Sequence, residues 1–277
     1  MNSLALNTHT RVLKNQADGL FQEGLRSYQQ QRFSDAVKSW GQAATLQHAA
    51  SHAFLSNMLM TGRYGVSKDE KRAFELAAAG AAKGCAHSKG ALGTCYIYGF
   101  GVAKNVGKGL ALGRESAAAG SYFGQFLVGK CCQLGWGVVQ DDAEAARWWR
   151  LAAAQGHAAA QCNLGVMFEK GLGVAQDNAE AVRLFRLASA HGLADAQRNL
   201  GFMLAKGRGV ARDYAEAVRL YRLAAAQGDS VAQNDLGVMY RDGEGVGMDR
   251  TEAIRLFRLA AAQGEEVAVQ NLRRMGV

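Results

Sequence analysis

A repeat of 36 residues runs through most of the chain and limits its fold more than any other feature. The clearest copies begin at residues 160, 196 and 232, and they align without insertions. The same register extends back to copies at 124, 88 and, more weakly, 52, and a partial copy fills 268–277. A unit of this length cannot bury its apolar side chains alone, whereas stacked units can. The chain is therefore predicted to fold as a stack of six similar units.

Fixed positions in each copy predict its second helix. One column holds Asp or Asn, which cap helices by accepting from free backbone N–H groups. In four copies a Glu follows three residues later, as in a capping box, and every copy ends in a glycine suited to a helix end. The caps are Asp69, Asn105, Asp141, Asp177, Asp213 and Asp249; the glutamates are Glu144, Glu180, Glu216 and Glu252; the glycines are Gly84, Gly120, Gly156, Gly192, Gly228 and Gly264. The second helix of each copy is expected between its cap and its glycine.

The first helix of each copy carries an interior glycine and ends in a Gly-x-Gly-Val loop. An interior glycine costs about 1 kcal/mol relative to alanine, so its recurrence predicts close contact with a neighbouring helix. The first copy departs from the loop pattern, with Arg63 in place of the first loop glycine. The interior glycines are Gly93, Gly129, Gly165, Gly201 and Gly237. Structural positions of this kind hold most of the 34 glycines of a chain that has no proline.

The combined pattern A-x-x-x-LG-x-x-[YF]-x-x-G-x-GV-x-x-D-x-x-x-A closely resembles the Sel-one-like repeat (SLR), a relative of the tetratricopeptide repeat. The resemblance covers residues 52–267. It implies an all-α fold, a right-handed α-solenoid of stacked antiparallel helix pairs whose first helices line the concave side. It also implies an adaptor function, because family members mostly hold other proteins in complexes.

The pattern divides the chain into four regions. Residues 1–12 are a predicted N-terminal tail. Residues 13–51 resemble a tetratricopeptide-like helix pair in which Ser34 caps the second helix and Trp40 shares a core column with Leu76. The six repeats span 52–87, 88–123, 124–159, 160–195, 196–231 and 232–267, and residues 268–277 are a C-terminal capping helix with Arg273 at the glycine position.

No motif in the sequence points to catalysis, a cofactor or a metal. The chain lacks HExxH, GxSxG, Walker and CxxC motifs, and its six histidines are scattered. We therefore predict no enzyme activity, no cofactor and no metal site. The five cysteines are odd in number, which favours free thiols in a reducing compartment, with the cytoplasm first. Arg11 and Lys14 without nearby acids also fit a weak organelle-targeting segment, so that location stays open.

Two columns on the first helices are candidates for binding a protein or peptide. The polar column holds Asn163, Asn199, Asp235 and Asn271, whose side chains could pair with the main chain of an extended peptide. The second column includes Met167, Met203 and Met239, and methionine surfaces adapt to varied partners. The alternatives are that asparagine is simply common in this slot of the family and that the methionines are buried packing residues.

Arginines recur in pairs on the second helices and predict a basic ridge. They are Arg147, Arg150, Arg183, Arg186, Arg219, Arg222, Arg255 and Arg258. The net charge of +8 fits an acidic partner or nucleic acid. A glutamate three residues before the first arginine of each pair lies within salt-bridge reach, so a solvated face is the alternative. Trp136, the variable residue of one Gly-x-Gly loop, is a possible hot spot for binding.

Together these features predict a non-catalytic adaptor or scaffold. It would bind a protein or peptide on the concave face of the solenoid and help to assemble a complex. Two alternatives stay open: a structural subunit of a large assembly, and a nucleic-acid-associated protein that uses the arginine ridges. No membrane insertion is expected, because no apolar run approaches the length of about 18 residues that a spanning helix needs.

Overall fold

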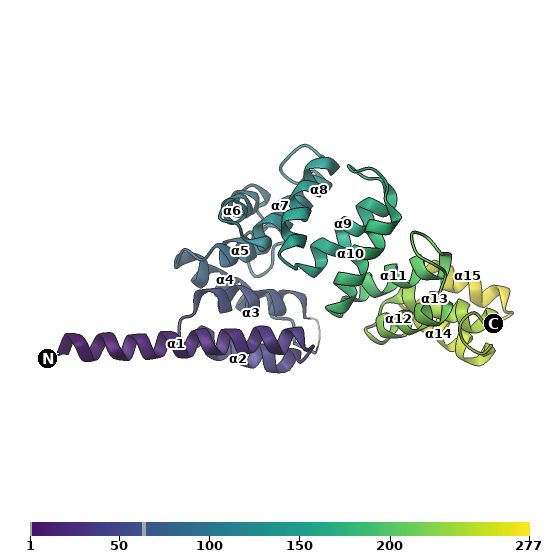
Figure 1. The fold of residues 1–277 in the computed structure, drawn as a ribbon, viewed down its shortest axis with the longest axis horizontal. Coiled ribbons are helices and arrows are strands. Elements are labelled where there is room, and N and C mark those ends of the chain that lie inside the picture. Colours follow the sequence, from purple (N-terminus) through teal and green to yellow (C-terminus); the bar gives the residue numbers. More distant parts are fainter. Residues whose placement is uncertain (1, 63–64) are drawn as a thin grey trace. The chain divides into compact units, whose positions relative to one another are not determined.

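A computed structural model describes residues 2–62 and 65–277, with side chains from residue 10 onwards (Figure 1). The described residues form fifteen α-helices and no strand. The helices are α1 (Asn2–Gln29), α2 (Phe33–Thr45), α3 (Ala49–Thr61), α4 (Glu70–Ala82), α5 (Ala86–Tyr98), α6 (Val106–Ala118), α7 (Tyr122–Leu134), α8 (Asp142–Ala154), α9 (Ala158–Lys170), α10 (Asn178–Ala190), α11 (Ala194–Lys206), α12 (Tyr214–Ala226), α13 (Ser230–Asp242), α14 (Arg250–Ala262) and α15 (Glu266–Arg274).

The chain divides into two compact units, Met1–Gln155 and Gly156–Val277. Unit 1 contains α1–α8 and unit 2 contains α9–α15. Within each unit, every helix packs against the next one along the chain, so successive helices form antiparallel pairs. Each unit is therefore built as an α-solenoid, in agreement with the predicted fold class.

The predicted caps begin the second helix of every repeat. The side chains of Asp69, Asn105, Asp141, Asp177, Asp213 and Asp249 each accept from a backbone N–H two or three residues later. The predicted capping box is not completed, however. The backbone N–H of each cap residue donates instead to a carbonyl of the preceding first helix, at 2.8–3.2 Å. This bond, which we call the stem bond, closes each helix pair at its loop end.

Four of the five interior glycines receive the aromatic rings of the paired second helices, whereas Gly93 faces the backbone of Gly109 and the side chain of Leu127. A methyl group added to Gly165 would lie 2.7 Å from the ring of Phe185, and one added to Gly237 would lie 2.7 Å from Phe257. Gly129 faces Trp149 and Gly201 faces Tyr221 in the same way. The predicted close contact at these four glycines is thus a ring inserted against the bare backbone of the first helix.

The first helix pair follows a register different from the predicted one. Its second helix begins 37 residues before α4 rather than 36, so Trp40 does not share a column with Leu76. Trp40 is the eighth residue of α2, as Trp149 is of α8, and it packs against Gly24 of α1 as the other rings pack against their glycines. The prediction for Trp40 was wrong by one position, because the loop between α3 and α4 contains one residue more than the corresponding loops of the later repeats.

Three further expectations differ from the structure at the N-terminal end. The segment predicted as a tail, residues 1–12, is helical from residue 2, because α1 begins at Asn2. The residue that precedes α2 is Arg32, and no side chain caps this helix, so Ser34 is not a cap. In the first repeat the left-handed residue that ends α3 is Gly62 with φ +59°, one position before the expected one. Arg63 itself lies outside the described residues.

Candidate partner-binding surfaces

The polar column lies on the first helices of unit 2, where three of its four members are partly exposed. Asn163, Asn199 and Asp235 are half-buried, on α9, α11 and α13. Asn163 forms no side-chain hydrogen bond with any described residue, and Asn199 makes one long contact, from Nδ2 to Cys162 Sγ at 3.8 Å. The amides of these two residues therefore remain free to bond with a ligand. We call Asn163, Asn199 and Asp235 the polar ladder.

The fourth predicted member of the column, Asn271, belongs to the interior. Its side chain is 4% exposed, donates from Nδ2 to Asn234 Oδ1 at 2.9 Å and accepts from Arg241 Nη1 at 3.3 Å. Both hydrogen bonds join α15 to α13. Asn271 therefore holds the last helix in place and does not extend the polar ladder.

Asp235 is the acidic member of the polar ladder and sits in a shielded place. Burial raises the pKa of its carboxyl group to about 6, although the amide of Asn234, at 3.2 Å, and the charge of Arg198 act in the opposite direction. Arg198 is itself held by Asp229 at 3.1 Å and by Asp195 at 3.3 Å. Because Asp235 gains or loses its proton near neutral pH, it can either donate to or accept from a bound group.

The methionine column lies inside the protein. Met167 and Met203 are fully buried and Met239 is 3% exposed. All three are on the first helices, and Met203 and Met239 belong to the main apolar cluster of unit 2. The expectation that these side chains contribute to a partner-binding surface is corrected by this burial, and the packing alternative describes them.

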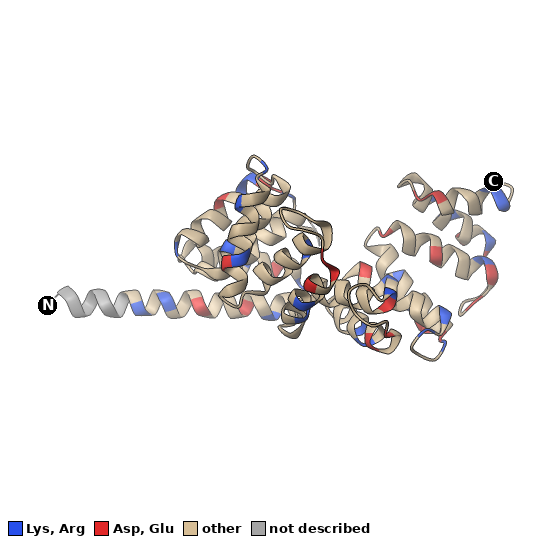
Figure 2. Ribbon diagram, turned by 90° about the horizontal axis from the view of Figure 1, so that it is seen from above, with Lys and Arg blue, Asp and Glu red and all other residues tan. Residues whose placement is uncertain are grey.

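The arginine ridges are exposed, but glutamates neutralise their first members. Arg183, Arg219 and Arg255 each form two hydrogen bonds with the glutamate three residues earlier, at 2.6–2.7 Å. In unit 1, Arg147 forms an ion pair with Glu144 at 3.0 Å. Figure 2 shows blue and red residues interspersed in both units rather than gathered by sign.

The second arginines of the pairs are also exposed. They are Arg150 in unit 1 and Arg186, Arg222 and Arg258 in unit 2. Arg222 donates to the hydroxyl oxygen of Tyr240 at 2.8 Å. The charge of Arg186 contributes to lowering the pKa of Glu216, after the larger effect of the hydrogen bond from Arg219. Acidic and aromatic groups therefore surround much of the ridge in unit 2.

Trp136 packs within an aromatic cluster on the loop edge of unit 1. Its ring meets Tyr98 edge-on at 5.5 Å, and Tyr98 stacks on Phe100 at 5.2 Å. Lys130 lies over Tyr98 and Lys68 over Phe100, at 5.4 and 5.3 Å from the ring centroids. Trp136 is half-buried. Exposed apolar atoms beside lysines still leave Trp136 a candidate contact for an acidic partner.

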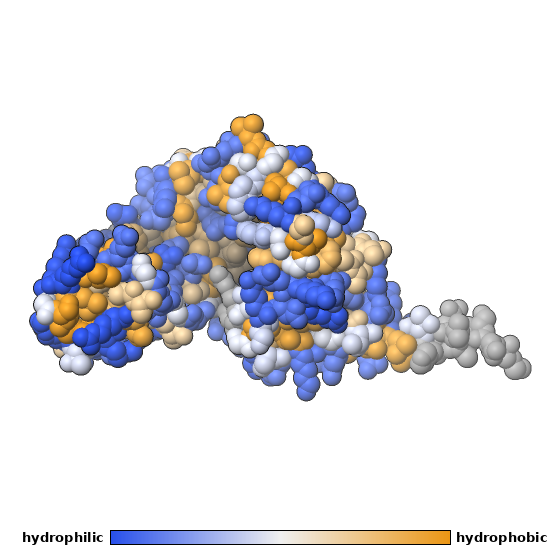
Figure 3. Space-filling view, turned by 180° about the vertical axis from the view of Figure 1, so that it is seen from behind, coloured by the Kyte–Doolittle hydropathy of each residue, from blue (hydrophilic) through white to orange (hydrophobic). Residues whose placement is uncertain are grey.

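The cysteine thiols are mostly buried. Burial raises the pKa of the Cys95 and Cys162 thiols to about 12 and that of Cys131 to about 11. In the described parts of the chain, all five cysteines are unpaired and no three His, Cys, Asp or Glu side chains gather as metal ligands would. None of the helices searched there is both long and apolar enough to span a membrane. Figure 3 shows one face of the molecule, on which small hydrophobic patches lie among hydrophilic residues.

A comparison with known protein families shows to which family the chain belongs. The Sel1 repeat model matches residues 49–85, 88–121, 123–157, 158–193, 194–229 and 230–265. The chain belongs to the Sel1 repeat family. The matched segments correspond to the helix pairs from α3–α4 to α13–α14, so each repeat starts at or near the beginning of a first helix. The sequence-based boundaries fell two or three residues inside these helices.

Solved structures show the same fold. A Sel1 repeat protein from Oxalobacter formigenes is 27% identical, with a TM-score of 0.65, over 99% of this chain and 82% of that one. A protective antigen present in uropathogenic Escherichia coli strains, described as displaying an SLR fold, is also 27% identical, with a TM-score of 0.62. That match covers 94% of this chain, which spans 57% of the length of the E. coli protein.

A more distant structural match is an immunity protein from Pseudomonas aeruginosa. It is 19% identical, with a TM-score of 0.51, over 77% of this chain and 81% of that one, and it indicates the fold alone. A search of curated proteins found no match to this chain. Sel1 repeat proteins generally mediate protein–protein interactions, and the family is generally a non-catalytic repeat scaffold.

Proposed function

We propose that this Sel1 repeat protein is a non-catalytic adaptor that binds a protein or peptide through the polar ladder of unit 2 and helps to assemble a complex. The observation that carries the proposal is the repeated presentation of half-buried amide and carboxyl groups by α9, α11 and α13. Asn163 and Asn199 each offer donors and an acceptor that no strong internal bond occupies. A rigid row of such groups binds an extended main chain with little loss of its own conformational freedom.

The test compares two double variants of the full chain. Asn163→Ala with Asn199→Ala removes the free amides, whereas Arg183→Ala with Arg219→Ala makes the same number of changes on the second helices as a control. Proteins that co-purify from the native source are identified by mass spectrometry, and the affinity of the principal partner is then measured with purified components. We expect the first variant to lose at least tenfold in affinity, as two lost hydrogen bonds would cause, and the control to keep it. Equal affinity for wild type and the asparagine variant would refute the proposal.

A nucleic-acid-associated function is the second candidate, supported by exposed Arg186 and Arg258 on the second helices. The glutamates bound to Arg183, Arg219 and Arg255 work against it, because they reduce the positive potential that phosphates require. If nucleic acid is the partner, binding must fall steeply with salt and be lost in Arg186→Glu with Arg258→Glu. Absence of binding at low salt would eliminate this candidate.

A structural subunit of a large assembly is distinguished by its behaviour when expressed alone. We expect an adaptor to be soluble and monomeric, whereas a permanent subunit would aggregate or be degraded without its partners. We also propose a reducing, intracellular location, with the cytoplasm first, which the unpaired and largely buried thiols support.

A further inference from the structure

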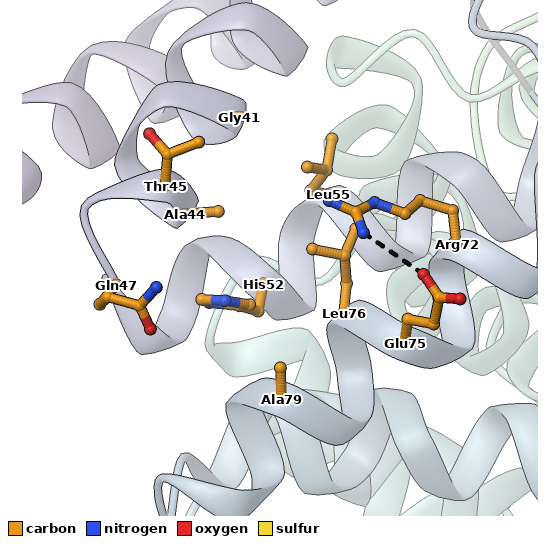
Figure 4. Close-up of a pocket in the computed structure, with 10 residues that line it drawn as sticks. All are labelled: Gly41, Ala44, Thr45, Gln47, His52, Leu55, Arg72, Glu75, Leu76 and Ala79. Atoms are coloured by element: carbon orange, nitrogen blue, oxygen red, sulfur yellow. Dashed lines mark hydrogen bonds and ion pairs between the residues drawn. The ribbon is translucent and has the colours of Figure 1, made fainter.

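A groove in unit 1 opens between the second helices α2 and α4, above α3 (Figure 4). Its volume is about 490 Å³. Apolar atoms form most of the lining surface, including those of Leu55 of α3 and Leu76 of α4, and Arg72 also lines the groove. The groove lies in the first repeat and the helix pair before it, far along the chain from the polar ladder.

Two of three substitutions relative to unit 2 leave the groove open. Gly41 is the ninth residue of α2, where α10 has Arg186. Ala79 is the tenth residue of α4, where α12 has Leu223. Two large side chains of unit 2 are therefore replaced by a hydrogen atom and a methyl group, and a methyl group added to Gly41 would meet nothing within 4 Å.

The third substitution changes the charge beside the groove. Arg72 is the third residue of α4, and the third residue of α12 is Glu216, which Arg186 approaches from α10. In unit 1 both members of this pair are changed. Gly41 occupies the position of Arg186, and Arg72 occupies the position of Glu216. Arg72 is held at the groove by Glu75, with Nη1 and Oε2 3.3 Å apart.

The groove also presents a hydrogen-bond acceptor, on a largely buried side chain, to which no described residue bonds. His52 is 5% exposed, and its ring lines the groove (Figure 4). Its Nδ1 lies 2.9 Å from the carbonyl oxygen of His48, and because a carbonyl can only accept, Nδ1 carries the hydrogen. Burial lowers the pKa of His52 against the opposing effect of the hydrogen bond to His48, and the charges of Lys83 and Arg72 add to the lowering, so the ring is neutral at pH 7. The Nε2 atom is then an acceptor, and no described residue bonds to it.

These features favour an aromatic ligand that carries one hydrogen-bond donor. An apolar floor accepts a ring, the guanidinium of Arg72 can stack on the face of a ring, and His52 Nε2 requires an N–H or O–H. We propose that this groove binds the indole side chain of a tryptophan presented by a partner protein. An aliphatic side chain would leave the acceptor of His52 unsatisfied, which buried polar groups rarely are.

The proposal is tested on the full chain with N-acetyl-L-tryptophanamide as the probe. NMR titration follows the ring resonances of His52, and the same titration is repeated with the analogue methylated on the indole nitrogen. We expect saturable binding of the probe and about tenfold weaker binding of the methylated analogue, since a buried acceptor is left unpaired. No saturable binding, or equal binding of the two compounds, would overturn the proposal. Tighter binding of free tryptophan than of the amide would indicate a small-molecule site and would overturn the assignment to a partner's side chain.

Matched glycine variants locate the site. Gly41→Arg restores the residue of unit 2 and should reduce binding at least tenfold by filling the groove. Gly19→Arg makes the same change on α1 outside the groove, where a methyl group also meets nothing within 4 Å, and should leave binding unchanged. Unreduced binding to Gly41→Arg would overturn the proposed location. These measurements use a purified chain and no partner, so their outcome is independent of the polar ladder.

Discussion

Replacing Gly124 by alanine should destabilise unit 1, although alanine is the better helix former. Gly124 is the third residue of α7. A methyl group placed there would lie 2.4 Å from the backbone nitrogen of Ala117 and 2.6 Å from the carbonyl oxygen of Gly113, both in α6. Backbone atoms cannot rotate away as a side chain can, so one helix must move as a whole.

The magnitude follows from two opposing contributions. Overpacking of this kind costs about 1–3 kcal/mol, and sometimes more. The gain in helix propensity from glycine to alanine is at most about 1 kcal/mol. We therefore expect a net loss of about 1 kcal/mol for Gly124→Ala, and up to about 2 kcal/mol if the helices cannot adjust. Gly41→Ala is the matched control in the same unit, and it should gain about 1 kcal/mol because its methyl group would meet nothing within 4 Å.

Urea unfolding followed by far-UV circular dichroism measures both variants. The comparison requires that the slope of the free energy of unfolding against urea stays the same, because a changed slope would mean a change in cooperativity or in the unfolded state. Stability of Gly124→Ala equal to or above that of wild type, at an unchanged slope, would refute the reasoning. So would a loss for Gly41→Ala as large as that for Gly124→Ala.

Three further predictions concern single side chains of unit 2. Asp213→Ala removes the acceptor for the backbone N–H of Glu216 at 2.9 Å and should cost about 1 kcal/mol in urea unfolding, whereas Asp213→Asn should keep most of the stability. The pKa of Asp235 is raised by burial from 3.8 to about 6, so its contribution to stability is lost as the pH rises through that window. Asp235→Asn should therefore be more stable than wild type at about pH 8 but not at about pH 4, and equal stability at the higher pH would contradict the shift. Burial lowers the pKa of His157 from 6.5 to about 4, so its contribution is complete above pH 6.5 and is lost as the pH falls towards 4. NMR should find the His157 ring unprotonated at about pH 5.5, whereas an ordinary titration would count against its burial.

Structural features that depend on a few adjacent residues were predicted correctly from the sequence. The Asp and Asn caps begin their helices, and the turn glycines, such as Gly192 with φ +78°, adopt the left-handed conformation that they were expected to adopt. These features depend on local backbone geometry, which a fixed spacing reveals. Glu180 shows the limit of such signals: its carboxylate binds Arg183, and the cap N–H that it was expected to meet is already used by the stem bond.

Structural features that depend on contacts between helix pairs could not be predicted as well from the sequence. Trp40 was misplaced because comparison at a spacing of 36 does not reveal the one-residue shift before α4. The methionine column could not be assigned to a surface or a core from its spacing alone, since both interpretations have the same period. The groove beside His52 arises where side chains are missing, at Gly41 and Ala79, and becomes visible only once α2 and α4 are placed together.

The stem bond allows a repeat loop to differ in length. In the first repeat the bond joins Asp69 to Leu59, and in the next it joins Asn105 to Tyr96, so the first loop contains one residue more between the same two anchors. The extra residue leaves the start of α4 intact. A repeat loop can therefore gain a residue between its two anchors while the helix that follows keeps its start, and the loop of the first repeat is the place where a recognition peptide could be inserted without redesigning the stack.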